Sequence, residues 1–354
     1  MNGTFRHANQ AAIPAMYGTL EPTEQAVSAS APRTARRVPR PVVRAAVLAL
    51  AAIAIQFAMV TAYAWASVNS APRNVPIAIT GPAPEVAAVT GQISLAKPGA
   101  FRLIPAATPG QAQADVTGRR AYGAIELTGG APKMLVAPGA SPAVANILTS
   151  LADRMTGVAA PPVRDIVPAS PADPNGTGFA FTVLPIAMSS LAAGILLSLG
   201  IRSRWSRAAA LVAFGVGGGA VSMAVAHTWL GIVPGSFPVL AAIAGLAALA
   251  AAAGVSGLAH VADRFGRITA GAAIGGALIM LVGNPFSAAG SAPEMLPGAW
   301  GMVGQSLPNG ALVTLLRSVA YFDGARSAGP WIVLAVWAAA GLLLTLAIPH
   351  RQRA

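Results

Sequence analysis

The sequence predicts an α-helical polytopic membrane protein, with about six transmembrane helices and an extracytoplasmic α/β domain inserted between the first and second helices. Three observations predict this class. Only 10% of the 354 residues are charged, whereas an ordinary soluble domain carries about 25%. The apolar residues, 55% of the chain, gather in runs of about twenty, the length that crosses a hydrocarbon core of roughly 30 Å. Short arginine-rich connectors separate several of these runs, as expected of cytoplasmic loops.

Residues 1–44 are expected to form a disordered, basic cytoplasmic tail. They are rich in Ala, Pro, Ser, Thr and Arg and show no hydrophobic period. Such a segment cannot bury enough apolar area to offset the entropy of ordering. The stretch from Arg33 to Arg44 is a basic cluster that suits anionic lipid headgroups.

Residues 45–66 are predicted to form the first transmembrane helix. The alternative is a cleaved signal peptide, because Ala64-Trp65-Ala66 is similar to a small-x-small cleavage site. The apolar stretch is longer than the apolar region of about 7–15 residues in a signal peptide, and a long tail precedes it. Both features favour an uncleaved anchor.

Residues 67–178 lack the membrane pattern and predict the extracytoplasmic α/β domain. A helix is expected at residues 141–155, where Ser141 can cap the helix and Pro142 suits its first turn. Short β-like runs lie at residues 75–80, 101–105, 122–127, 133–137 and 163–167. Strands that alternate with helices are typical of a small α/β domain.

Residues 179–354 predict a five-helix membrane domain. Its spans are expected at residues 179–200, 208–229, 237–258, 268–284 and 331–348. The span at 268–284, fifth in the whole chain, is short and is followed by a proline. Two glycine pairs, Gly215/Gly219 and Gly271/Gly275, have the four-residue spacing that lets helix backbones approach closely in lipid.

The distribution of charge predicts the topology. With six spans and the tail inside, the cytoplasmic segments carry a net charge of +10. The outer segments carry +2, and the two values together give the total of +12. Because cytoplasmic loops collect Lys and Arg, this pattern indicates a multi-pass protein of the plasma membrane, with both termini cytoplasmic and the large domain outside. The cytoplasmic segments are residues 1–44, 201–207, 259–267 and 349–354.

Composition and motifs exclude several function classes. The basic residues flank apolar runs instead of forming a stripe with interleaved aromatics, which argues against a nucleic-acid partner. No cysteine is present, which excludes disulfides, thiolate metal sites and cysteine nucleophiles. The sequence has no phosphate-binding loop and no metal-binding motif, so we expect no cofactor and no ATP hydrolysis by the chain itself. The predicted spans contain no Lys, Arg, Asp or Glu, which disfavours a proton-driven antiporter.

One serine invites an enzymatic interpretation. The sequence Gly254-Val-Ser-Gly257 resembles the serine motif of rhomboid intramembrane proteases. A serine nucleophile needs a base within hydrogen-bond reach, normally a histidine, and the sixth span contains none. His260 lies one turn after Ser256, at the predicted cytoplasmic side. We therefore predict a helix-packing role for Ser256 and no enzymatic activity.

The segment between the fifth and sixth spans, residues 285–329, is too apolar for a plain loop but is broken by prolines. Residues 297–306 and 309–322 are expected to form two short helices that lie in the outer interface or dip into it, within about residues 293–322. The aromatic types found there are enriched at that membrane depth. Two roles are open for this pair of helices: an interfacial hairpin that only packs, or a part in substrate passage.

Five residues of this segment are candidates for a substrate path or an outer gate. They are Trp300, Pro308, Arg317, Tyr321 and Asp323. Trp300 and Tyr321 are suited to the membrane–water interface. We expect the charged side chains of Arg317, Asp323 and Arg326 to stay in contact with water or with each other.

Two segments resemble a known family. One runs from Asp165 to Gly178 and reads DIVPASPADPNGTG, and the other occupies residues 305–324 and reads QSLPNGALVTLLRSVAYFDG. Both are similar to actinobacterial members of the phage-infection-protein (YhgE/Pip-like) family, which are relatives of type-two permeases of ATP-binding-cassette exporters. The layout of one span, an outer domain and five further spans agrees, and the resemblance covers most of the chain from about residue 40.

The resemblance implies a permease-like subunit, dimeric in the lipid bilayer, that exports a hydrophobic or lipid-like substrate while a separate ATP-binding-cassette ATPase hydrolyses ATP. Permeases of this class usually offer the ATPase a cytoplasmic coupling helix, and both inner loops here are very short. In one of them, Arg202, Arg204 and Arg207 are candidates for partner docking or for a plain positive-inside anchor. The alternative function is a non-transporting cell-envelope protein whose outer domain binds a phage, a secretion component or cell-wall material.

Overall fold

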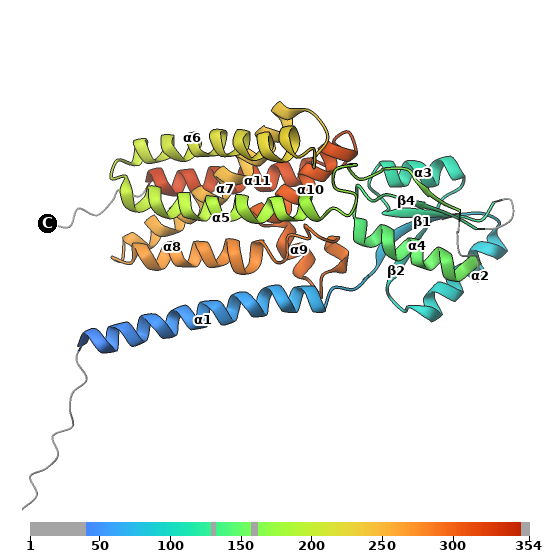
Figure 1. Cartoon of the computed structure of the whole chain (residues 1–354), viewed down its shortest axis with the longest axis horizontal. Coiled ribbons are helices and arrows are strands. Elements are labelled where there is room, and N and C mark those ends of the chain that lie inside the picture. The colour runs from blue at the N-terminus through green and yellow to red at the C-terminus, as the bar shows by residue number, and fades with distance from the viewer. Residues whose placement is uncertain (1–39, 129–131, 157–161, 348–354) are drawn as a thin grey trace, which may run out of the picture. The chain divides into compact units, whose positions relative to one another are not determined.

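The structure is a computed structural model that describes residues 40–128, 132–156 and 162–347. Most of the predicted tail, up to residue 39, and the last segment, residues 348–354, lie outside this part of the chain. Helix α1 spans Arg40–Val68. The chain divides inside α1 into two compact units, residues 1–51 and residues 52–354. The second part of α1 and all the other elements described below belong to the second unit, and Figure 1 shows them.

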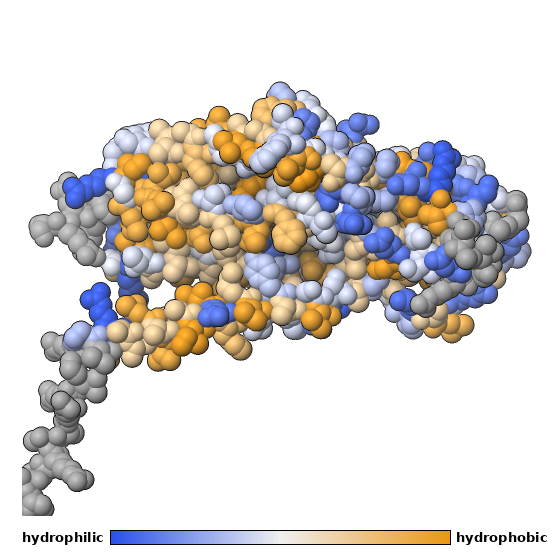
Figure 2. Space-filling view, viewed as in Figure 1, coloured by the Kyte–Doolittle hydropathy of each residue, from blue (hydrophilic) through white to orange (hydrophobic). Residues whose placement is uncertain are grey.

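Five helices among the described residues are long and apolar enough to cross a bilayer. This finding supports the predicted class of a helical, membrane-embedded protein. The helices are α1, α5 (Thr177–Gly200), α6 (Arg204–Met223) with its π-helical continuation η1 (Ala224–Trp229), α7 (Phe237–Asp263) and α11 (Ala328–Ala347). Figure 2 shows apolar residues over much of the helical bundle and more polar residues over the α/β domain.

The fifth predicted span is shorter than a membrane crossing. It consists of α8 (Ile268–Ala277) and a π-helical segment, η2 (Leu278–Gly283). At about 1.5 Å per residue these elements reach roughly 24 Å, less than the roughly 30 Å of a hydrocarbon core. The fifth of the six predicted spans is therefore too short for a full crossing, because the helical backbone ends just before Pro285.

Helix α7 lies at the centre of the bundle and contacts α5, α6, α8 and α11 (Figure 1). Of its most apolar stretch, 72% is buried. Glycines permit this close packing: a methyl group on Gly219 of α6 would lie 2.5 Å from the Cα of Gly245 in α7. Gly271 and Gly275 of α8 likewise face the backbone of α7. Both predicted glycine pairs are thus at helix crossings.

The α/β domain contains a five-stranded mixed sheet with the order β2-β1-β3-β4-β5. Strand β1 pairs in parallel with β2 and β3, β3 pairs antiparallel with β4, and β4 pairs in parallel with β5. All five predicted strands are present, with differences of at most two residues at their ends. The strands are β1 (Val75–Thr80), β2 (Phe101–Pro105), β3 (Gly123–Glu126), β4 (Lys133–Val136) and β5 (Val163–Asp165).

Helices cover both faces of the sheet. Because successive side chains of a strand point to opposite faces, Ile77 and Ile79 of β1 pack in one core with α2 (Ala83–Ala96) and α4 (Pro142–Thr156), whereas Ala78 packs in another with α3 (Pro109–Thr117). The predicted cap of α4 is present, since the Ser141 hydroxyl accepts a hydrogen bond from the Val144 N–H at 3.3 Å.

We call residues 284–327 the cap segment, and we call the end of the bundle where α1 ends and α5 begins the domain end. The cap segment contains η3 (Pro293–Met295), α9 (Trp300–Gln305) and α10 (Pro308–Tyr321). The two predicted short helices exist, but α10 is mostly buried and packs against α7 and α11. The predicted place of these helices in the outer membrane interface stays a prediction, and the structure adds that α10 is covered by other helices of the bundle.

The cap segment joins the α/β domain on both faces of its sheet. Met295 belongs to the apolar core that contains α2 and α4, and Phe322 belongs to the core that contains α3. The α/β domain and the domain end of the bundle therefore share hydrophobic cores, which fixes the position of one on the other.

Candidate functional site

The segment from Asp165 to Gly178, the first of the two family-like segments, forms the entry into α5. The carboxylate of Asp173 is 7% exposed and accepts hydrogen bonds from the N–H groups of Gly178 at 3.0 Å and Phe179 at 2.7 Å. These N–H groups have no partner within the helix, so the carboxylate satisfies them. The segment thus fixes where α5 begins, beside the cap segment.

Arg317 of α10 binds the backbone of the cap segment. Its side chain is 5% exposed. It donates to the carbonyl oxygens of Ala288 at 3.0 Å, Ser291 at 3.0 Å and Ala289 at 2.6 Å, and it lies 5.0 Å from the centre of the Phe179 ring. Our expectation that Arg317 contacts water or Asp323 is wrong, because α10 is buried and its arginine is enclosed by these carbonyls.

Other polar residues of the second family-like segment also hold the cap segment together. The Gln305 side-chain amide donates to the Ser287 carbonyl at 3.2 Å and its oxygen accepts from the Thr314 hydroxyl at 2.5 Å. Asn309 donates to the Ile279 carbonyl at 3.3 Å. That carbonyl belongs to the π-helical η2, in which the regular α-helical pairing is interrupted. The second family-like segment therefore holds the cap segment in place through hydrogen bonds to residue 287 and to η2.

Polar contacts also cross from the cap segment to the α/β domain. Arg119 donates to the Thr314 carbonyl at 2.9 Å and to the Ser318 hydroxyl. The Tyr122 hydroxyl donates to the Glu294 carboxylate at 2.8 Å. Burial, and then the Glu294 charge, raise the pKa of Tyr122 far above its ordinary value, and burial lowers the pKa of Arg119.

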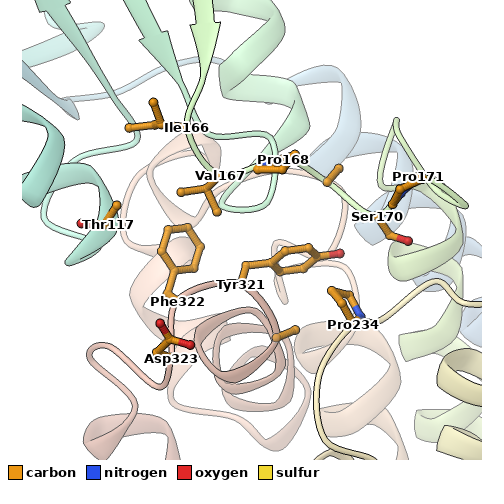
Figure 3. Close-up of a pocket in the computed structure, with 12 residues that line it drawn as sticks. Thr117, Ile166, Val167, Pro168, Ser170, Pro171, Pro234, Tyr321, Phe322 and Asp323 are labelled. Atoms are coloured by element: carbon orange, nitrogen blue, oxygen red, sulfur yellow. The ribbon is translucent and has the colours of Figure 1, made fainter.

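A pocket of about 460 Å³ lies between the cap segment and the α/β domain, and we call it the junction pocket (Figure 3). In Figure 3 the ring of Phe322 points toward Val167, and the ring of Tyr321 extends toward Ser170. Burial raises the pKa of Tyr321. The hydroxyl of Ser170 already donates to the Gly231 carbonyl at 2.6 Å. Prolines and aromatic rings make up much of the lining, so this pocket offers few free polar groups.

A second pocket, which we call the lateral cleft, lies between α1, α5 and the start of the cap segment and has a volume of about 360 Å³. Its walls come from the last turns of α1 and the first turns of α5, so it opens at the domain end. None of the described lining residues is Asp, Glu, Lys or Arg. The lining consists of Tyr63, Ala66, Ser67, Ser70, Ala180, Phe181, Leu184, Asn284, Pro285, Ser287, Ala288, Ala289, Gly290, Ser291 and Leu296.

Tyr63 and Asn284 supply polar groups in the lateral cleft. The side-chain amide of Asn284 donates to the Tyr63 hydroxyl oxygen at 2.7 Å. Within the described residues, the Tyr63 hydroxyl proton has no acceptor and the Asn284 side-chain oxygen has no donor. Phe181 and Leu184 on α5 form an apolar wall. The cleft is therefore amphipathic, with an uncharged polar floor and an apolar side.

The five candidate path residues do not form one site. Trp300 stacks on Phe286 at 4.5 Å between ring centres and lies 6.5 Å from the Trp65 ring of α1. Pro308 is buried at the first turn of α10. Tyr321 and Asp323 line the junction pocket. Arg317 lies behind the loop that lines the lateral cleft.

The three candidate docking arginines differ in exposure. Arg202 and Arg204 are exposed, and Arg204 donates to the Leu346 carbonyl at 3.1 Å. Arg207 is fully buried and donates to the Ile201 carbonyl at 3.1 and 2.6 Å through two nitrogens. Arg207 therefore cannot offer its guanidinium to a partner. Helix α6 begins at Arg204 and α7 ends at Asp263, so these charged residues lie in helical turns outside the predicted spans 208–229 and 237–258.

Ser256 is fully buried in α7. Its hydroxyl accepts a hydrogen bond from the Thr345 hydroxyl of α11 at 3.2 Å. The Nδ1 atom of His260 lies 2.7 Å from the Ser256 carbonyl oxygen, so this nitrogen faces the backbone of Ser256 and not its hydroxyl. The predicted helix-packing role of Ser256 agrees with this geometry.

Comparison with protein-family models, with curated proteins and with solved structures found no match to this chain. The resemblance to the phage-infection-protein family therefore stays a prediction that rests on its two segments.

Sequence reasoning missed the residues of the lateral cleft. Tyr63 and Asn284 lie 221 positions apart, and each alone reads as an ordinary polar residue near a helix end. One signal was available: Asn284 directly follows an apolar run and precedes a proline. A polar side chain at the end of a short span is a candidate for a buried hydrogen bond.

Proposed function

We propose that this chain is a permease-like membrane protein that takes a lipid-like molecule into its lateral cleft and serves the export of that molecule, with a separate ATPase supplying the energy. The charge pattern supports an orientation in which the α/β domain lies outside the cytoplasm. The single observation that carries the proposal is the amphipathic lateral cleft between α1 and α5.

The depth of the cleft suits an amphiphile. Its α1 residues lie between Tyr63 and Ser67, and its α5 residues between Ala180 and Leu184, so both sets fall within about two turns, or roughly 11 Å, of a helix end. In a bilayer, such positions lie near the boundary between headgroups and hydrocarbon. A lipid-like molecule would place its polar head at Asn284 and its hydrocarbon along Phe181.

The attachment of α1 supports lateral access to the cleft. From Ala52 onward, Ala66 is the only buried residue of this helix among those described. The fixed contacts gather at its end: Tyr63 with Asn284, and Trp65 with Phe286 at 6.1 Å between ring centres. A helix that is held at one end leaves the flank of the cleft accessible from the hydrocarbon.

Blocking the cleft tests this function. Ala180→Trp fills the cleft, and Val221→Trp adds the same side chain to α6 at a position that is 66% exposed, far from the cleft lining. We expect native mass spectrometry in mild detergent to show bound lipid on the wild type and on Val221→Trp but not on Ala180→Trp. Equal lipid retention by all three proteins would contradict the proposal.

The energy source is tested separately. Affinity purification in mild detergent should recover an ATP-hydrolysing partner whose activity is stimulated by lipid and falls to the basal rate with Ala180→Trp. If the cleft binds lipid but no ATPase accompanies the chain, lipid binding stands and powered export does not.

A second function is favoured by a groove in the α/β domain. A cleft of about 520 Å³ lies between α2 and α4, and its lining includes the partly exposed apolar side chains of Phe101, Ile147 and Leu151. An exposed apolar groove is a common feature of partner-binding surfaces. A non-transporting envelope protein would use this groove to bind its partner. The variant Leu151→Arg should then abolish function in cells, whereas Ala180→Trp should leave it intact.

A further inference from the structure

The loop that lines the lateral cleft has peptide groups with a fixed orientation. The carbonyl oxygens of Ala288 and Ala289 both accept hydrogen bonds from Arg317. In a planar trans peptide the carbonyl and the following N–H point in opposite directions. The N–H groups of Ala289 and Gly290 therefore point away from Arg317. Neither donates to an acceptor among the residues that the structure describes.

Both N–H groups belong to residues that line the lateral cleft. Ala289 is partly exposed and Gly290 is exposed. A Cβ added at Gly290 would lie 4.0 Å from the Cβ of Ala180, which places this glycine opposite α5 across the cleft. Two adjacent backbone donors without acceptors, at an accessible position, are an arrangement that binds anions.

The positive charge of Arg317, which lies behind this loop, is an independent observation. Arg317 is 5% exposed, and no carboxylate of the described residues forms an ion pair with it. Burial lowers the pKa of Arg317 to about 10, so the guanidinium is still protonated at neutral pH. The lining of the cleft also contains no acidic residue. A buried cation without a counter-charge therefore lies next to an accessible cleft that has free donors.

We propose that the lateral cleft binds the anionic headgroup of an amphiphile, whose phosphate or carboxylate oxygens accept hydrogen bonds from the N–H groups of Ala289 and Gly290. The Tyr63 hydroxyl, whose proton has no acceptor among the described residues, is a third donor. The hydrocarbon lies along Phe181 and Leu184. This inference rests on the proposed function and adds the class of substrate, an anionic lipid.

Arg317 acts on the headgroup through the peptide groups and does not touch it. One carbonyl and one N–H separate the guanidinium from a bound oxygen, a path of roughly 8 Å. Hydrogen bonds in such a chain polarise one another, and the buried setting screens the charge weakly. Arg317 is therefore a positioning residue that orients two donors and adds a positive potential at the headgroup.

The test measures lipid preference on the full chain by native mass spectrometry. Purified protein is offered phosphatidylglycerol and diacylglycerol with identical acyl chains in equal amounts. We expect the wild type to retain the anionic lipid at least tenfold over the neutral one. Equal retention of both lipids by the wild type would overturn the inference, while the proposed function would stand if Ala180→Trp still abolished binding of both.

Variants locate the effect. Arg317→Gln keeps a donor but removes the charge, and we expect the preference to fall to near one. Arg326→Gln makes the same change at an exposed arginine and should leave the preference unchanged. If Arg317→Gln does not fold, Tyr63→Phe takes its place and should lower the preference about threefold. An unchanged preference in the folded Arg317→Gln, or in Tyr63→Phe when that variant replaces it, would contradict the inference.

A final experiment distinguishes a site for a lipid headgroup from a site for a free oxyanion. Inorganic phosphate at about 10 mM should not displace phosphatidylglycerol from the wild type, because it gains nothing from the apolar wall. Displacement by phosphate alone would show a site for a free anion and would overturn the assignment to a lipid.

Discussion

Helices α7 and α1 have the same mean hydropathy, 2.2 over their most apolar stretches, but opposite environments. In α7, 72% of that stretch is buried by neighbouring helices. In α1, from Ala52 onward, only Ala66 is buried among the described residues. Hydropathy alone therefore identifies helices that suit a bilayer but does not say which of them lies inside the bundle.

Glycine distinguishes the two helices. Gly245 of α7 lies against Gly219 of α6, and a methyl group on Gly341 of α11 would lie 2.5 Å from the Ala253 carbonyl oxygen of α7. The described part of α1 contains no glycine. Glycine lets two helix backbones approach most closely in lipid, and this kind of crossing is found at α7 and not in the described part of α1, whose last turns line the lateral cleft.

The largest effect should come from the α6–α7 crossing. Gly219→Leu would force apart two backbones in contact and should destabilise the protein by about 4 kcal/mol or more. Gly217→Leu is the matched control, because nothing lies within 4 Å of a Cβ added there. The melting temperature in detergent measures both. A Gly219→Leu protein as stable as Gly217→Leu would contradict the central position of α7.

The second largest difference between α7 and α1 should appear when one apolar side chain is removed from each helix. Leu240 of α7 is fully buried, and Leu240→Ala should cost about 3 kcal/mol because it leaves a cavity. Ile55 of α1 is 60% exposed, and Ile55→Ala should change stability by less than about 0.5 kcal/mol. Thermal unfolding of both variants checks the difference, and similar losses would show that α1 is packed as tightly as α7.

The hydrogen bond between Tyr63 of α1 and Asn284 of the cap segment should contribute less to stability than the buried side chain of Leu240. Tyr63→Phe and Asn284→Leu each remove one side of the 2.7 Å hydrogen bond. A double-mutant cycle should give a coupling of about 1 kcal/mol. Zero coupling in the thermal stability of the four proteins would mean that this bond does not hold α1.

The smallest expected effect on stability is a pH dependence that comes from the α/β domain. Unlike most of α1, this domain shares buried contacts with the cap segment. The pKa of the buried Tyr122 is raised, so the folded protein keeps the phenol proton where the unfolded chain, with a pKa near 10, loses it. Stability should therefore fall as pH rises above about 10, by less than about 1 kcal/mol at pH 10.5. Tyr122→Phe removes this contribution, and the difference in pH dependence between the two proteins measures it.

Much of the fold could be predicted from the sequence. The strands were found because short β-like runs alternate with helical patterns, and the long spans because hydropathy is a strong signal. The short α8 was predicted as a full span because its apolar run continues into η2 and stops at Pro285, and the change from α-helix to π-helix leaves no mark in the hydropathy.

The site could not be predicted, because its parts meet only in three dimensions. Arg317 was recognised as a candidate from its position in a proline-broken segment, but its partners are backbone carbonyls, which no sequence pattern identifies. Tyr63 and Asn284 approach each other only because α1 ends beside the cap segment. The free N–H groups of Ala289 and Gly290 follow from peptide orientation, which depends on Arg317 and not on the identity of those residues.

The most direct test of the lateral cleft is to close it reversibly. Because the chain contains no cysteine, Ser67→Cys on α1 and Ala180→Cys on α5 can be joined across the cleft by a short bifunctional reagent with a reducible bond, with each single variant as a control. We expect the joined protein to lose its bound lipid in native mass spectrometry and to regain it after reduction. Undiminished lipid on the joined protein would contradict lateral entry beside α1.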